Sequence, residues 1–157
     1  MDEPGRIVTI SEIHKQLGEI EKVFRVLVER EERLAAGEAV VIEGAAFHIH
    51  NYYNAVEDLL RIVAAAFENN IQDASRWHSE LIDRMTMDIE RVRPRFLSDE
   101  TAQLLHRLRS FRHFFRHAYR VTLDGDEIQI NVGRVRQVHA LLLADVAAFV
   151  AAIRPGD

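Results

Sequence analysis

Apolar residues recur at intervals of three and four along most of this chain, and this spacing limits the fold more than any other feature, because it places them on one face of an α-helix. The first such stripe comprises Ile13, Leu17, Ile20, Phe24, Leu27 and Leu34. It predicts a helix over about residues 11–36. Thr9 and Glu12 resemble a capping box at the start of this helix, and Gly37 suits its end.

Four further segments carry the same signal. The second helix should hold Tyr52, Val56, Leu59, Leu60, Val63 and Phe67, and the third Trp77, Leu81, Met85 and Ile89. The fourth should hold Leu104, Leu105, Leu108, Phe111, Phe115 and Ala118, and the last Val135, Val138, Leu142, Val146, Phe149 and Ile153. Pro94 closes the third segment, and Ser98, followed by two acidic residues, is a good N-cap for the fourth helix.

These segments predict an all-α protein. The connection between the first two helices is short, so we expect an antiparallel up-and-down bundle of four to five helices. At 157 residues with 48% apolar side chains, the chain fits one domain around one core. We therefore expect a single domain over residues 1–157, with short flexible ends at residues 1–9 and 154–157, and no strand.

Composition excludes several classes of protein. The sequence contains no cysteine, which excludes disulfide frameworks, thiolate metal sites and cysteine nucleophiles and favours a reducing compartment. The first ten residues lack a basic start followed by an apolar stretch, and no uninterrupted apolar run approaches the roughly 18 to 20 residues that cross a bilayer. We expect a cytoplasmic protein that is neither secreted nor inserted in a membrane.

Positive charge is concentrated in one part of the chain. The formal net charge is −5, yet residues 91–120 contain eight arginines against two carboxylates, those of Asp99 and Glu100. No lysine occurs in this stretch, and arginine makes forked hydrogen bonds to phosphate that lysine does not make. Because the position of charge matters more than its total, we expect an anionic ligand at this stretch.

The predicted fourth helix carries a polar face made of arginine and histidine. Each member lies three or four positions from another member along one band, and they are Arg109, Arg112, His113, Arg116 and His117. Residues 101–120 include no carboxylate that would relieve their mutual repulsion. Such a face is favourable if an anion binds to it.

This face has the groups needed to cleave RNA through the RNA's own 2′-hydroxyl. The reaction requires a base for the hydroxyl proton and a cation for the charged phosphorane, and it needs no metal or cofactor. His117 lies near the C-terminal end of the helix, where the dipole favours imidazolium, so it is the candidate acid or base. Arg112 is the candidate for holding the phosphate.

Other interpretations of the same residues stay open. An arginine-rich helical face is also typical of a solvated or partner-binding surface, or of a plain structural bundle. His113 and His117 have the spacing of two metal ligands on a helix, although no acidic or cysteine ligand lies near them in the sequence. His48 and His50 should face away from each other, one at the edge of the core and one at the surface.

The run RHFFRHAY, from Arg112 to Tyr119, resembles the signature of HEPN ribonucleases, which is an arginine, four to six residues, a histidine, any residue and a tyrosine. The longer stretch RPRFLSDETAQLLHRLRSFRHFFRHAYRVTLD is similar to the corresponding part of HepT-like toxins. Upstream, YNAVEDLLRIVA at residues 53–64 resembles the Tyr-Asn and Glu pattern of that family's second long helix. His113 stands where asparagine or aspartate is commoner.

The resemblance implies an HEPN-like bundle that forms a homodimer, so that two copies of the motif face one cleft. Arg112 and His117 would be the catalytic pair. The cleft would be lined by His113, Arg116 and Arg109. The substrate would be RNA, with tRNA as one candidate, and the partner would be a nucleotidyltransferase antitoxin that attaches AMP to Tyr119. The alternative is a non-catalytic helical module that binds such a nucleotidyltransferase.

Overall fold

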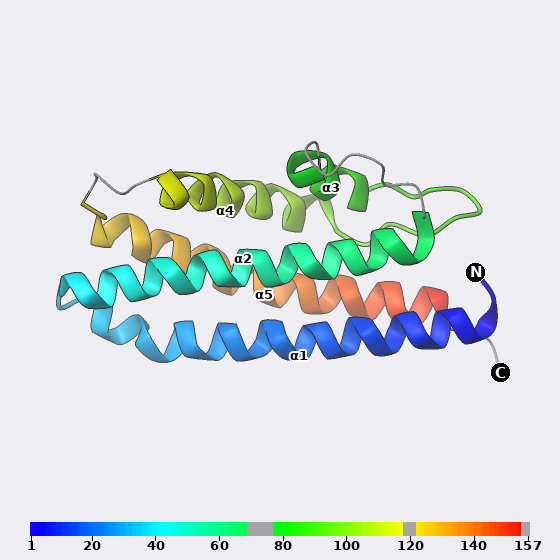
Figure 1. The fold of residues 1–157 in the computed structure, drawn as a ribbon, viewed down its shortest axis with the longest axis horizontal. Helices are drawn as coiled ribbons and strands as arrows, with labels where there is room; N and C mark the ends of the chain where they lie inside the picture. Colours follow the sequence, from blue (N-terminus) through cyan, green and yellow to red (C-terminus); the bar gives the residue numbers. More distant parts are fainter. Residues whose placement is uncertain (69–76, 118–121, 155–157) are drawn as a thin grey trace.

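The computed structural model describes residues 1–68, 77–117 and 122–154, and these residues form a bundle of five helices (Figure 1). The helices are α1 (Glu3–Leu34), α2 (Ala39–Glu68), α3 (Trp77–Met85), α4 (Asp99–His117) and α5 (Gly125–Ile153). Within the described ranges no strand occurs, and the nearest approach to one is an isolated bridge between Ile89 and Arg93. The predicted all-α class is confirmed.

Helices α1 and α2 form an antiparallel pair. The most deeply buried apolar side chains of α1, Ile13, Ile20, Leu27 and Leu34, lie seven residues apart. This interval keeps one seam of a helix against its neighbour. Gly37 makes the turn between the two helices at a φ of 71°, a conformation that glycine adopts without steric cost, so its predicted place at the helix end is confirmed.

The start of α1 differs from the prediction. The helix begins at Glu3, so most of the N-terminal end that was expected to be flexible is helical. Asp2 caps the helix, because its carboxylate accepts the amide of Gly5 at 3.0 Å, and Pro4 lies in the first turn. Thr9 is buried inside the helix, where its hydroxyl donates to the carbonyl of Gly5 at 2.8 Å. The capping box was wrong because this aspartate and proline start the helix earlier.

The end of α3 also differs. The helix ends at Met85 and does not extend to Ile89. The carbonyl of Met85 accepts the amides of Phe96 and Leu97 at 2.8 and 3.0 Å, so it is not available to continue the helix. Ile89 instead donates its amide to the carbonyl of Arg93 at 2.9 Å. The segment after α3 therefore folds back on that helix, and it buries Phe96 and Leu97 in the core.

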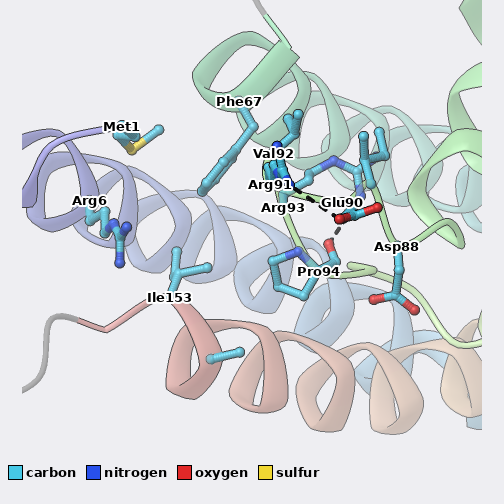
Figure 2. A pocket seen from close by; sticks show the side chains of 12 residues that line it. Met1, Arg6, Phe67, Asp88, Glu90, Arg91, Val92, Arg93, Pro94 and Ile153 are labelled. Carbon is cyan, nitrogen blue, oxygen red and sulfur yellow. Dashed lines mark hydrogen bonds and ion pairs between the residues drawn. The ribbon is translucent and has the colours of Figure 1, made fainter.

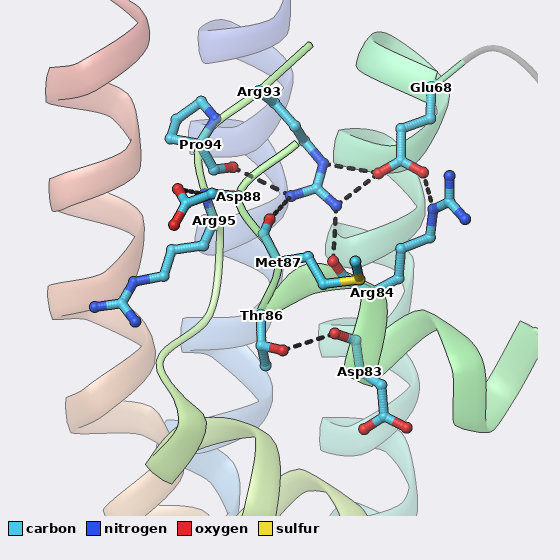
Figure 3. Close-up of polar contacts among 9 residues, drawn as sticks. All are labelled: Glu68, Asp83, Arg84, Thr86, Met87, Asp88, Arg93, Pro94 and Arg95. Carbon is cyan, nitrogen blue, oxygen red and sulfur yellow. Dashed lines mark hydrogen bonds and ion pairs between the residues drawn. The ribbon is translucent and has the colours of Figure 1, made fainter. Parts of the chain in front are cut away.

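A buried arginine holds this segment in place (Figure 3). The side chain of Arg93 is fully buried and bonds the Glu68 carboxylate through two nitrogens, at 2.6 and 2.7 Å. Its other donors reach the carbonyls of Met87, Pro94 and Arg84 at 3.1, 3.1 and 2.9 Å. Arg84 pairs with the same carboxylate from the more exposed side. The network joins the ends of α2 and α3 to the segment that leads into α4.

The start of α4 is tied to α5. The hydroxyl of Ser98 accepts the amide of Thr101 at 3.3 Å, so the predicted N-cap is confirmed. Asp145, on α5, accepts the amide of Ser98 at 2.9 Å and the hydroxyls of Ser98 and Thr101 at 3.1 and 2.6 Å. Together with the Arg93 network, these bonds determine where the arginine- and histidine-bearing helix begins.

Helix α5 runs beside α1, α2 and α4. It begins directly after Asp124, whose side chain accepts the amide of Asp126 at 3.0 Å, and thus well before Val135, the first residue of its predicted stripe. By length and composition alone α5 could cross a membrane, and 39% of its most apolar window is buried in the bundle. In Figure 1, the start of α1 and the end of α5 lie at one end of the bundle, and the end of α4 lies toward the other.

Candidate functional site

Helix α4 presents one face to solvent. It packs against α2, α3 and α5 and, among the described residues, has no contact with α1. Leu105, Leu108 and Phe111 are buried, as predicted, and Phe115 is half-buried. The exposed side chains toward its C-terminal end include His113, Phe114, Arg116 and His117. The helix is therefore amphipathic as predicted, with leucine and phenylalanine side chains in the core and histidine and arginine side chains among the exposed residues.

Arg112 is turned toward α2. Its Nε donates to the side-chain oxygen of Asn54 at 2.7 Å, and its guanidinium carbon lies 5.6 Å from the centre of the Tyr53 ring. The side chain is partly buried, and both partners are uncharged at neutral pH. A cation held in this way has a fixed orientation without a neutralising partner.

This arrangement contrasts with most other paired arginines of the described residues. Those that end on carboxylates are Arg25, Arg61, Arg84, Arg93 and Arg136, together with Arg91 at longer range. Arg112 keeps its full positive charge, and α4 contributes no carboxylate after Glu100 to offset it. Among the described residues no carboxylate pairs with Arg112, so an incoming anion would meet an oriented guanidinium.

His117 has a defined tautomer. Its Nδ1 lies 2.8 Å from the backbone carbonyl of His113, and a carbonyl oxygen only accepts hydrogen bonds, so Nδ1 carries a proton. The other nitrogen, Nε2, then has a free lone pair in the neutral ring and a second proton in the imidazolium. The ring of His113 lies 4.6 Å from that of His117, and both side chains are exposed. His117 is thus prepared to accept or donate a proton at Nε2.

Arg109 is half-buried one turn before Arg112, and both act on Tyr53. Burial and the carboxylate of Glu57 raise the pKa of the Tyr53 phenol, while the two arginines oppose that rise. Tyr53 is therefore a neutral aromatic surface under Arg112. In the sequence Tyr53 belongs to the Tyr-Asn pattern of the predicted second helix, and no role at the site was predicted for it.

His50, on α2, belongs to the same neighbourhood, although no functional role was predicted for it. Its Nε2 lies 3.0 Å from the side-chain nitrogen of Asn54, and its ring lies 5.7 Å from that of Phe115. Burial, and then the charges of Arg112 and Arg116, lower its pKa. A histidine and an asparagine four residues apart on one helix are the signal that sequence reasoning passed over.

His48 faces a different helix. Its Nε2 lies 2.6 Å from a guanidinium nitrogen of Arg30 on α1, whereas His50 faces α4. The two histidines do face apart, as predicted. Both are half-buried, so the expectation that one of them would lie at the surface was wrong.

The five predicted site residues on α4 do not form one continuous cluster. Arg112 points to α2, whereas His113 and His117 contact each other at the exposed end. In the described part of the chain no hydrogen bond joins Arg112 to His117. Tyr119, the predicted modification site, lies outside the described residues. The structure thus describes the arginine and histidine parts of the motif.

Other features of the described residues lie apart from this site. No group of three or more histidine, aspartate or glutamate residues among them is arranged to hold a metal ion. A pocket of about 460 Å³ lies where the start of α1 and the end of α5 meet the loop before α4 (Figure 2). Its charged lining residues are Arg6, Asp88, Glu90, Arg91 and Arg93. None of the predicted site residues lines this pocket.

Comparison with known proteins gives one match. The family model for HepT-like proteins matches residues 44–153, which extend from the first part of α2 to the end of α5. No curated protein and no solved structure matches significantly. The matched segment contains the whole of α4 and both of the α2 residues that contact Arg112.

Proposed function

This chain belongs to the HepT-like family, and from that membership and the geometry of α4 we propose that it is the toxin of a toxin–antitoxin pair and cleaves RNA. The observation that carries the proposal is the state of Arg112, a cation oriented by neutral partners. It lies five positions before His117, whose Nε2 has no hydrogen-bond partner among the described residues. Phosphate chemistry needs such a cation and such a base.

In the proposed reaction, Nε2 of His117 removes the proton from a ribose 2′-hydroxyl. The 2′-oxygen forms a bond to the adjacent phosphorus, and the bond from phosphorus to the 5′-oxygen breaks. The His117 imidazolium formed by the first proton transfer protonates the leaving 5′-oxygen. Arg112 stabilises the negative charge that builds up on the phosphorane. The products are a 2′,3′-cyclic phosphate and a 5′-hydroxyl, and no step uses a metal ion or cofactor.

Further parts of the proposal follow from the family. We propose that two copies pair with their α4 faces together, which the exposed Phe114 and the open face of α4 support. The partner would be a nucleotidyltransferase antitoxin that transfers AMP from ATP to the Tyr119 hydroxyl, releasing pyrophosphate. The added bulk and negative charge next to Arg112 and Arg116 would block the phosphate site. We further propose that the protein acts in the cytoplasm. We also propose that residues 1–157 form one domain, because α1 packs on α2 and α5.

The test is cleavage of total RNA, including tRNA, by the purified protein. Arg112→Ala and His117→Ala should each lower the rate by about 100-fold or more, the usual contribution of an acid–base or charge-stabilising group. His106→Ala and Arg107→Ala are matched controls on the same helix. His106 bonds Asp83 at 2.6 Å, and Arg107 is exposed and is not one of the five predicted site residues on α4. Both should cleave like the wild type, with or without a chelator.

Two outcomes would refute the proposal. One is no cleavage by any variant, and the other is equal cleavage by wild type, Arg112→Ala and His117→Ala. The first, together with a stable complex with the neighbouring nucleotidyltransferase that His117→Ala leaves unchanged, would favour the non-catalytic binding module. A 2′-deoxy substitution at the cleaved position should abolish cleavage if the 2′-hydroxyl is the nucleophile.

A further inference from the structure

The hydrogen bonds around Asn54 fix the orientation of its side-chain amide. A guanidinium only donates, so the atom of Asn54 that faces Arg112 must be the oxygen, at 2.7 Å from Nε. The amide nitrogen then faces His50, with 3.0 Å between it and Nε2 of the imidazole. An amide nitrogen also only donates, so Nε2 of His50 accepts. The chain of bonds runs from Arg112 through Asn54 to His50 in a single direction.

This direction determines the proton of His50. Because Nε2 carries a lone pair, the neutral ring has its proton on Nδ1. Nδ1 is buried, and no hydrogen-bond partner for it occurs in the described part of the chain. The neutral ring thus keeps its Nδ1 proton unpaired while Nε2 supports Asn54. Buried polar groups without a partner are uncommon and usually accompany a functional requirement.

The surroundings of His50 oppose a charge on the ring. From α4 it is faced by the cations Arg112 and Arg116 and by the ring of Phe115. From α2 its contact is the neutral Asn54, and the described residues of α1 and α5 give it no hydrogen bond or ion pair. Burial and the two arginines accordingly hold its pKa below the ordinary value of 6.5.

We propose that His50 is a positioning residue for Arg112, which it holds by fixing the amide of Asn54 while its own ring is neutral. This inference rests on the proposed function in one respect, namely that the positioned Arg112 binds the scissile phosphate. A protonated His50 has a donor at both nitrogens, so Nε2 would face the amide nitrogen of Asn54 donor to donor. Asn54 must then rotate, and Arg112 loses its acceptor. The guanidinium is therefore held at neutral pH and released in acid.

The direct test is nuclear magnetic resonance of the full-length protein, with no RNA present. His50 should show the Nδ1-protonated tautomer at neutral pH. The Nε–H signal of Arg112, assigned by its loss in Arg112→Lys, should be protected at neutral pH. It should disappear in acid as His50 takes up a proton, at a pH below the ordinary histidine value because burial and the two arginines lower the pKa of His50. In His50→Gln, the amide oxygen replaces Nε2 as an acceptor that does not titrate, so the protected signal should persist in acid.

His48→Gln is the matched control, because His48 is also half-buried and has a lowered pKa but bonds Arg30 on the other side of α2. It should lose the Arg112 signal in acid as the wild type does. An Nε2-protonated His50 at neutral pH would overturn the inference. So would loss of the Arg112 signal in His50→Gln over the same pH range as in the wild type.

RNA cleavage supplies the second readout. His50→Ala should lower kcat by about 10- to 100-fold, the effect of losing a charge-assisted hydrogen bond, while circular dichroism shows a folded protein. His50→Gln should restore the rate at neutral pH and retain it at lower pH than the wild type does. If the wild type cleaves no RNA but the Arg112 signal behaves as expected, the proposed function fails and the positioning role stands. If cleavage follows Arg112 and His117 but His50→Ala is as fast as the wild type, the positioning role fails alone.

Discussion

Replacement of Arg93 by methionine tests the buried network that positions α4 (Figure 3). The substitution keeps much of the side-chain volume but removes the hydrogen bonds that Arg93 donates to Glu68 and to three backbone carbonyls. Removing one member of a buried ion pair costs about 3–5 kcal/mol, because the remaining charge is left without its partner. Arg84 still pairs with Glu68, so we expect about 3–4 kcal/mol, in the lower part of that range.

Urea denaturation measures this loss. With a slope of about 2 kcal/mol per molar, the midpoint of unfolding should fall by about 1.5–2 M. Arg91→Met is the matched control in the same loop, because Arg91 and its partner Glu90 are each 90% exposed, 3.7 Å apart. An exposed pair contributes little, so the free energy of unfolding should change by less than about 0.5 kcal/mol.

A double variant separates the ion pair from simple loss of packing. Arg93→Met combined with Glu68→Gln should cost at least about 1 kcal/mol less than the two single changes added together, because the double variant no longer buries a carboxylate that has lost its buried partner. Purely additive costs, or a midpoint for Arg93→Met that equals that of Arg91→Met, would refute the reasoning.

Three further predictions concern stability. Gly37→Ala should lower the free energy of unfolding by about 1 kcal/mol, because alanine is strained at a φ of 71°, whereas Gly18→Ala inside α1 should raise it by roughly 0.5–1 kcal/mol. Urea midpoints that shift in the same direction would contradict this. Stability should fall as the pH drops below about 6.5, because the lowered pKa values of His48 and His50 mean that the unfolded chain takes up more protons there. In the same denaturation experiment, the double variant His48→Gln, His50→Gln should show a free energy of unfolding that depends less on pH. Asp145→Ala should lower the free energy of unfolding by about 2–3 kcal/mol and speed hydrogen exchange in the first turn of α4, because three donors lose their acceptor. Unchanged exchange would contradict the role of Asp145 in holding the start of α4.

The existence and type of the helices could be predicted, because each buried stripe extends over several turns. Helix ends were harder, since they depend on single hydrogen bonds that compete with the periodic signal. The apolar pattern around Ile89 fits a helix, yet the amides of Phe96 and Leu97 take the carbonyl of Met85 and end α3. At the start of α1, Asp2 caps the helix before the apolar stripe from which the helix was predicted, so this cap was missed.

The candidate site shows the same division between local and distant information. The arginine and histidine face of α4 follows from spacing along one helix. The acceptor for Arg112 is Asn54, 58 positions earlier in the chain, and no pattern within α4 could identify it. Spacing also groups Arg112 with His113, although packing against α2 turns the arginine inward and leaves the histidine exposed.

The arrangement of the chain ends has a practical consequence (Figure 1). The start of α1 and the end of α5 lie at one end of the bundle, and α5, with 29 residues, extends about 43 Å from there toward the other end, where α4 ends. An affinity tag, fluorophore or surface tether joined to the start of α1 or beyond α5 would therefore be attached far from His117. Immobilised protein would keep that helix end turned toward the solution, so the proposed binding of RNA could be tested there one molecule at a time.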